Sequence, residues 1–166
     1  MKTAIKFGIY TGVSVALWTI IMGLTGWFKD PVLLNLFWVV IVFQLVLLYL
    51  GIRIYSKENS VNGELIKTYS DLIKVGLILT LTAGVIIFLS SIFFTTVLYP
   101  NYFDEINEAY RQILAETGKS ESEIEILLIE NSKTQTPFFQ AFFGFIGTIL
   151  TGLLGSSIFA AIFRKR

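Results

Sequence analysis

The sequence predicts an all-α membrane protein with four transmembrane helices and an acidic amphipathic helical hairpin between the third and the fourth. Of its 166 residues, 54% are hydrophobic and only 15% are charged, whereas roughly a quarter of the residues in a soluble domain are charged. The charges are also unevenly placed, because they leave four uncharged stretches of 20 residues or more. About 20 apolar residues are enough to cross a bilayer as a helix. We therefore expect one transmembrane domain over residues 1–166.

The first predicted span is residues 7–28, which follow Lys2 and Lys6. A secretory signal peptide also begins with basic residues, but its apolar core is only about 7–15 residues long and ends at a small-residue cleavage site. The run in this chain is longer and ends in Gly26-Trp27-Phe28. We therefore predict a retained helix.

The second predicted span is residues 31–52, which begin directly after the first. Asp30 is the type of residue that caps a helix N-terminus, and Pro31 suits the first helical position. So short a connection predicts that the first two spans form an antiparallel helical pair.

The third predicted span is residues 75–99, with Ser70 as the candidate cap and Pro100 as the stop. The fourth is residues 137–163, which begin with the cap-and-proline pair Thr136-Pro137. At 1.5 Å per residue this last helix reaches roughly 40 Å, more than the 30 Å of a hydrocarbon core. We expect it to tilt, kink or protrude.

Residues 101–131 read as two amphipathic helices separated at Gly118-Lys119. Ser120 and Glu123 form a capping-box pattern at the start of the second. The apolar side chains recur at three- and four-residue spacing and predict a hairpin that lies against the bundle or the lipid surface. They are Phe103, Ile106, Tyr110, Ile113, Leu114, Ile124, Leu127 and Leu128.

Eight carboxylates and three basic residues lie between residues 101 and 135, which raises the question of a divalent cation. Asp104 with Glu108, and Glu121 with Glu125, have the i,i+4 spacing at which two carboxylates could share an ion. They lack the dense oxygen spacing of a calcium-binding loop. We interpret them as a solvated acidic face and predict no metal ligands.

The basic residues predict the orientation, because Lys and Arg concentrate on the cytoplasmic side of a membrane. Four lie on the side of the hairpin: Lys29, Arg111, Lys119 and Lys133. Nine lie on the other: Lys2, Lys6, Arg53, Lys57, Lys67, Lys74, Arg164, Lys165 and Arg166. Both termini are therefore expected in the cytoplasm and the hairpin outside.

Three of the four spans carry a face of small residues, which allow close contact between helices in a membrane. The first has Gly8, Thr11, Gly12, Ala16, Thr19, Gly23 and Gly26; the third has Gly76, Thr80, Ala83, Gly84, Ser90, Ser91 and Thr95; the fourth has Gly144, Gly147, Thr148, Thr151, Gly152 and Gly155. We expect these three spans to pack tightly, with the second outermost. The hydroxyls on these faces are expected to bond their own helix backbones; the alternative is that they line a ligand cleft.

The residue types that are absent exclude several chemistries. The chain has no Cys and no His, so it lacks thiolate nucleophiles and imidazole bases. Its intramembrane serines (Ser14, Ser90, Ser91, Ser156 and Ser157) have no basic partner in the spans, so we predict no catalytic residues and no cofactor. No charged residue lies within the spans, which argues against proton coupling. The net charge of +1 gives no reason to expect nucleic acid.

Several short motifs, taken in order along the chain, resemble a known family. They are Lys6-Phe7-Gly8, Leu50-Gly51-Ile52-Arg53, the stretch from Tyr69 to Gly76, Thr136-Pro137 and the Gly-rich last span that ends in Arg164-Lys165-Arg166. In order and spacing they resemble the bacterial multi-pass family called domain of unknown function 4199. The resemblance implies four spans in a bacterial inner membrane, and it implies no activity and no site residues.

These observations together predict a non-enzymatic accessory or scaffold subunit of the inner membrane. Its expected partners are membrane lipids and, through the small-residue helix faces, another membrane protein or a second copy. The alternative is a small transporter, or a transporter subunit, with a Ser/Thr-lined cleft between the first, third and fourth spans.

Overall fold

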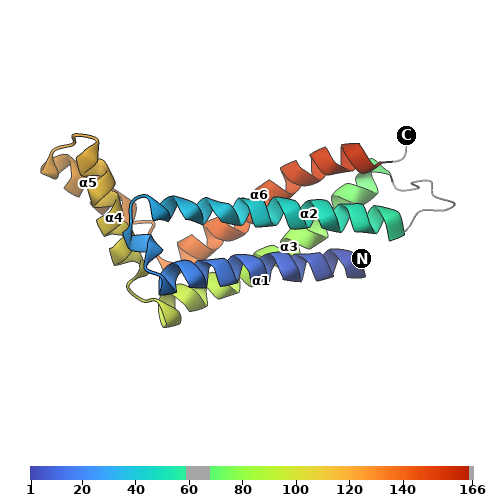
Figure 1. The fold of residues 1–166 in the computed structure, drawn as a ribbon, viewed down its shortest axis with the longest axis horizontal. Helices are drawn as coiled ribbons and strands as arrows, with labels where there is room; N and C mark the ends of the chain where they lie inside the picture. Colours follow the sequence, from blue (N-terminus) through green and yellow to red (C-terminus); the bar gives the residue numbers. More distant parts are fainter. Residues whose placement is uncertain (59–67, 165–166) are drawn as a thin grey trace.

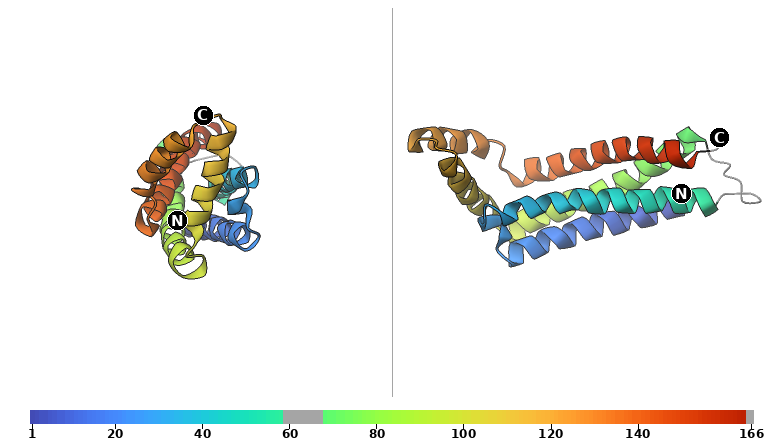
Figure 2. Two further views of the ribbon diagram at one scale, coloured as in Figure 1. Left: turned by 90° about the vertical axis from the view of Figure 1, so that its left-hand side faces the viewer. Right: turned by 45° about the horizontal axis from the view of Figure 1, so that its top comes forward.

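The computed structural model describes residues 1–58 and 68–164, and every regular element in that part of the chain is helical. Four long helices lie side by side, and two shorter ones stand at one end of them (Figure 1 and Figure 2). The long helices are α1 (Lys2–Leu24), α2 (Val39–Glu58), α3 (Tyr69–Phe93) and α6 (Pro137–Phe163), and the shorter ones are α4 (Tyr102–Glu116) and α5 (Glu121–Ser132). With their flanking turns, the four long helices are long and apolar enough to cross a membrane.

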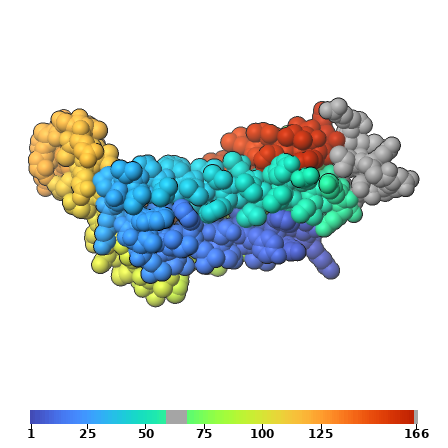
Figure 3. Space-filling model, in the orientation of Figure 1, coloured from blue at the N-terminus to red at the C-terminus, as the bar shows by residue number. Residues whose placement is uncertain are grey.

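The N-terminus and the end of α6 lie together at the end of the bundle opposite to α4 and α5 (Figure 1). The charged residues Glu64, Lys67, Lys165 and Arg166 lie outside the described residues. In the space-filling view, α4 and α5 project beyond the bundle and leave a concave edge between themselves and α6 (Figure 3).

Helix α1 is displaced toward the N-terminus relative to the predicted span 7–28. It ends at Leu24, and Gly26 then adopts a left-handed conformation with φ of 73°. The 3₁₀ turn η1 (Trp27–Lys29) follows, and the side chain of Phe28 is completely buried. The apolar run therefore continues past the end of the helix because Phe28 fills the core from a turn.

Helix α2 is preceded by the 3₁₀ helix η2 (Leu33–Trp38) rather than beginning at Pro31. Asp30 is not the N-cap of η2, which is Val32, but it stabilises the preceding turn, since its Oδ1 accepts the backbone N–H groups of Val32 at 2.8 Å and Leu33 at 3.0 Å. The helix then continues to Glu58, beyond the predicted end at Ile52.

Helix α3 is capped by Thr68 and not by Ser70, which corrects the prediction. The Thr68 hydroxyl accepts the backbone N–H of Asp71, and the Asp71 carboxylate accepts the backbone N–H of Thr68, each at 3.2 Å. This reciprocal pair starts the helix at Tyr69. At the other end, the π-helical turn η3 (Phe94–Leu98) leads into Tyr99 and Pro100.

Helix α6 has the predicted bounds. Thr136 accepts the backbone N–H of Phe139 at 3.2 Å, and Pro137 occupies the first turn. The helix runs obliquely to α2 (Figure 1) and packs on α3 and α2.

The predicted small-residue face of α3 packs against that of α6, and the small-residue face of α1 packs against another side of α3. A Cβ atom added at Gly8 would lie 2.6 Å from the Leu79 carbonyl oxygen, and one at Gly12 would lie 2.7 Å from Ile86. On the opposite side of α3, a Cβ at Gly152 would overlap the side chain of Thr80. These backbones can approach each other only because the residues at the contacts have no side chain.

Helix α2 is the least buried of the four long helices, in agreement with its predicted outer position. It nevertheless packs on α1, α3 and α6, because one stripe of it is buried. The stripe consists of Val40, Gln44, Leu48, Gly51, Ile52 and Ser56. Although it carries no face of small residues, it makes one close contact, since a Cβ at Gly51 would lie 2.7 Å from Leu79 and 3.1 Å from Phe7.

Besides a small cluster of Val15, Val40 and Ile87, two larger apolar clusters hold the bundle together, one toward each end. The cluster near the termini includes Leu48, Ile52, Leu72, Val75 and Leu79. The other cluster is aromatic and joins the bundle to α4, as its buried members Phe28, Phe94 and Tyr102 show. This second cluster forms one side of the cavity described next.

Candidate functional site

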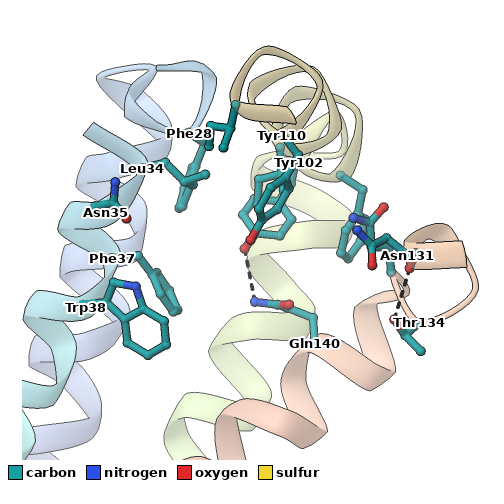
Figure 4. A pocket seen from close by; sticks show the side chains of 14 residues that line it. Phe28, Leu34, Asn35, Phe37, Trp38, Tyr102, Tyr110, Asn131, Thr134 and Gln140 are labelled. Carbon is teal, nitrogen blue, oxygen red and sulfur yellow. Dashed lines mark hydrogen bonds between the residues drawn. The ribbon is translucent and has the colours of Figure 1, made fainter. Parts of the chain in front are cut away.

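A cavity of about 380 Å³ lies at the end of the bundle that carries α4 and α5. We call it the aromatic cavity. It is bounded by η1, η2, one side of α4, the end of α5 with the segment that leads to α6, and the first turn of α6 (Figure 4). The residues that line it are Phe28, Leu34, Asn35, Phe37, Trp38, Tyr102, Phe103, Ile106, Tyr110, Ile113, Asn131, Thr134, Gln135 and Gln140.

The wall of the aromatic cavity is fixed by ring contacts between segments that are distant in sequence. The left-handed turn at Gly26 places Phe28 inside the bundle. There its ring meets that of Tyr102 edge-on, with 4.9 Å between ring centroids, and that of Phe94 at 6.1 Å. Edge-to-face pairs of this kind contribute about 0.5–1.5 kcal/mol each beyond the area that they bury. The start of α4 is thus held firmly against η1.

Two polar contacts cross the cavity between α4 and the segment around the start of α6. Gln140 donates from Nε2 to the hydroxyl oxygen of Tyr102 at 3.1 Å (Figure 4). Asn107 and Gln135 exchange two amide hydrogen bonds of 2.7 and 2.8 Å. Burial of the Tyr102 side chain raises the pKa of its phenol well above the ordinary value of 10, so this group is neutral at physiological pH.

Two amide oxygens of the lining have no protein partner. Within residues 1–58 and 68–164, no side chain or backbone group donates a hydrogen bond to Oδ1 of Asn35 or Oε1 of Gln140. Both side chains are at least partly accessible. These oxygens are therefore available to a hydrogen-bond donor that enters the cavity.

Two charged residues that neighbour lining residues in the sequence, Lys29 and Glu105, are paired with each other. Lys29 of η1 and Glu105 of α4 form an ion pair of 2.7 Å, and Tyr99 also donates its hydroxyl to Glu105. Burial, this hydrogen bond and the carboxylate charge raise the pKa of Tyr99 to about 12. None of the described residues that line the cavity is charged.

A second, narrower space of about 80 Å³ continues from the aromatic cavity between α1, α3 and α6. We call it the hydroxyl slot, because Thr19, Ser90, Ser91 and Thr95 line it among apolar side chains. It shares three lining residues, Phe37, Tyr102 and Gln140, with the aromatic cavity. The slot is large enough for water but much too small for a ligand of the size that the aromatic cavity could hold.

The comparison with protein families gives one match. The model of a family described as protein of unknown function, DUF4199, matches residues 6–165. The chain belongs to the DUF4199 family. No curated protein and no solved structure matches it.

The hydroxyls of the DUF4199 chain are mostly bonded within their own helices. In the hydroxyl slot, Thr19 donates to the Val15 carbonyl at 3.0 Å, and Thr95 donates to that of Ser91 at 2.9 Å. Thr11, Thr80, Thr82, Thr148 and Ser157 make the same type of bond to the residue four positions earlier. This is the packing role predicted for these hydroxyls.

Two buried polar groups of the spans are not fully satisfied. Gln44 of α2 donates to Thr148 of α6 at 3.4 Å, but its amide oxygen has no partner among the described residues. The hydroxyl of Ser156 also has none, and it lies against the backbone of Gly76. Neither residue lines the aromatic cavity or the hydroxyl slot, so we assign both to the packing of the bundle.

The acidic residues considered as metal ligands lie on α4 and α5. Glu121 forms an ion pair with Arg111, which joins the two helices. Within the described ranges, no three acidic side chains approach closely enough to hold an ion together. Asp104 and Glu108 remain on the exposed face of α4.

The sequence did not reveal the aromatic cavity. Its lining comes from five separate segments. Two of its central residues were not singled out by the sequence: Tyr102 directly precedes the predicted apolar stripe of the hairpin, and Gln140 follows the predicted cap of α6. The only sequence signal was the cluster of Asn and Gln side chains close to aromatic residues at the ends of the spans. With amides, phenols and rings, this arrangement can bind a ligand without covalent chemistry.

Proposed function

We propose that this DUF4199 protein is a multi-pass protein of the bacterial inner membrane that acts as a non-enzymatic accessory or scaffold subunit and binds a lipid or another membrane protein. The observation that carries the proposal is that the polar and small residues of the spans mainly serve contacts within the protein. Most of their hydroxyls bond to backbone carbonyls, and most of their glycines form helix contacts. What is left for a partner is the uncharged cavity at one end and the exposed apolar sides of the helices.

The proposed orientation has both termini in the cytoplasm and an acidic hairpin of α4 and α5 outside. It is supported by the excess of Lys and Arg at the end of the bundle that carries the termini. In α4, Tyr102 and Ala109 are the buried residues, and in α5 it is Ile124. We propose that the remaining, mostly polar side of the pair faces water.

Purification of the full chain in a mild detergent, followed by identification of the lipids and proteins that remain bound, tests this function. We expect either a stoichiometric second protein or an enriched lipid class. A preparation that keeps neither, and that shows a covalent turnover of added lipid, would contradict the proposal.

A second function is favoured by one observation, the hydroxyl slot between α1, α3 and α6. A small transporter or transporter subunit would use such a Ser/Thr-lined cleft. Ser91 lines the slot, and no described group pairs with its hydroxyl. A polar metabolite that co-purifies with the wild type and is lost in Ser91→Ala, but not in the matched variant Ser157→Ala, would support transport over an accessory role.

A further inference from the structure

We propose that the aromatic cavity binds the uncharged, hydroxyl-bearing headgroup of a membrane lipid. This inference deepens the proposed function, on whose membrane location it rests. It is drawn from the position, the size, the free hydrogen-bonding groups and the charge of the cavity.

The position of the cavity corresponds to the depth of lipid headgroups. It lies where η2 and α6 begin, at one end of the segments that can span a membrane. At its edge Trp38 is 64% exposed, and Trp side chains concentrate at the boundary between lipid and water. Phe138 and Phe139, on the neighbouring first turn of α6, are also exposed. Acyl chains attached to a bound headgroup would lie along these apolar sides of the bundle.

The shape of the cavity suits a compact ring-shaped group. Phe37 and Trp38 form one side, and Tyr102 and Gln140 face them from the other (Figure 4). The volume of about 380 Å³ is close to the lower limit of about 300 Å³ for small-molecule sites. A headgroup of this size fits, whereas a whole lipid does not.

The free polar groups call for a ligand that both donates and accepts hydrogen bonds. The amide oxygens of Asn35 and Gln140 need donors. The indole N–H of Trp38 needs an acceptor, because no described group takes its hydrogen bond. A hydroxyl group does both. A phosphodiester offers acceptors alone, so it would leave the two amide oxygens unpaired.

The absence of charge from the described lining argues further against ionic headgroups. A buried ion without a partner is costly, and Lys29, which follows the lining residue Phe28, is already paired with Glu105. A quaternary ammonium group would need the open faces of several aromatic rings. Phe28 and Tyr102 pack against each other edge to face, so that the ring face in this contact is not open to a cation. Neither argument applies to an uncharged sugar or glycerol headgroup.

The test is native mass spectrometry of the full chain in mild detergent. Equal amounts of monoglucosyl diacylglycerol, phosphatidylethanolamine and phosphatidylcholine with identical acyl chains are added. We expect the glucosyl lipid to be retained at least fivefold over the other two. Gln140→Leu should reduce its retention about tenfold, the usual effect of losing a buried hydrogen-bond partner. The matched variant Gln112→Leu changes an exposed glutamine of α4 outside the cavity and should retain the lipid as the wild type does.

Two further measurements keep the outcome decisive. If Gln140→Leu fails to fold, Asn35→Leu replaces it, because Asn35 is exposed and makes only two long contacts of 3.4 Å. An excess of soluble methyl glucoside should not displace the lipid; if it does, the ligand is a free saccharide and the lipid assignment is wrong. Equal retention of the three lipids, or a preference for the choline lipid, would overturn the inference. A protein that co-purifies without any such lipid preference would leave the proposed function intact.

Discussion

At the scale of single residues, the glycines of α6 differ in what their missing side chains allow. A Cβ at Gly152 would overlap Thr80 of α3, whereas a Cβ at Gly147 would meet nothing within 4 Å. The sequence analysis placed both glycines on one predicted packing face of α6. Helical periodicity shows which residues share a face, but it does not show how much of that face a neighbouring helix covers. The structure therefore corrects the prediction for Gly147.

We expect Gly152→Leu to destabilise the bundle and Gly147→Leu to leave it near the wild-type stability. Forcing a large side chain into a closely packed contact typically costs about 1–3 kcal/mol or more. Thermal melting in one detergent would compare the two variants, which add the same side chain to the same helix. Equal melting temperatures would show that the α3–α6 contact at Thr80 is not a packing seam.

Two buried serines provide a second comparison at the residue scale. Ser56 of α2 donates to the Phe163 carbonyl of α6 at 3.3 Å, whereas Ser156 has no described partner. Both side chains are at most 1% exposed. A buried hydroxyl without a hydrogen bond costs about 1–3 kcal/mol.

Ser156→Ala should therefore leave the melting temperature unchanged or raise it, and Ser56→Ala should lower it. Each substitution removes one oxygen atom from a buried site, so the difference between them reports the hydrogen bond. A clear loss of stability in Ser156→Ala would mean that its hydroxyl makes a stabilising bond within the membrane-spanning bundle.

At the scale of elements, the caps decide where helices begin more closely than hydropathy does. Thr136 and Pro137 allowed the start of α6 to be predicted to the residue, and Ser120 and Glu123 did so for α5. The start of α3 was missed by six residues, because the capping pair Thr68 and Asp71 precedes the uncharged run. Charged residues of a helix that extends beyond the apolar stretch are invisible to a hydropathy criterion.

The cap of α5 should make this helix sensitive to acid. Hydrogen bonds from the Ser120 hydroxyl and backbone N–H lower the pKa of the Glu123 carboxyl below its ordinary value of 4.5. A group whose pKa is lowered on folding stabilises the fold above its unfolded pKa and loses that effect as the pH falls through its folded pKa. The cap therefore contributes fully at neutral pH.

We expect the amide protection of the first turn of α5 to fall as the pH drops below about 4.5, after correction for intrinsic exchange rates. Glu123→Gln should remove this pH dependence, because an amide can still accept the two bonds but does not titrate. Glu125→Gln, at an exposed neighbouring position, should keep it. A pH dependence that survives in Glu123→Gln would have to come from another carboxyl.

At the scale of the whole molecule, the sequence predicts the number and order of the membrane-spanning helices. It does not predict the aromatic cavity at the end of the bundle that carries α4 and α5. The four spans follow from uncharged stretches, and the contacts of α3 with α1 and α6 follow from small residues at helical spacing. The aromatic cavity depends on the left-handed turn at Gly26, on the burial of Phe28 and on the approach of Tyr102 to Gln140. Each of these contacts joins distant segments, so periodicity within one helix carries no signal for them.

The last prediction concerns the orientation of the whole chain in the membrane. The nine basic residues on the side of the termini and the four on the side of α4 and α5 predict cytoplasmic termini. The chain has no Cys, so one introduced cysteine reports one position.

In intact cells, Ser122→Cys on α5 should react with a membrane-impermeant maleimide, and Ser70→Cys at the start of α3 should react only after the membrane is opened. Both positions are exposed at opposite ends of the bundle, so accessibility within the protein does not separate them. The reverse labelling pattern would show that the basic bias does not set the orientation, and would place the aromatic cavity at the cytoplasmic surface.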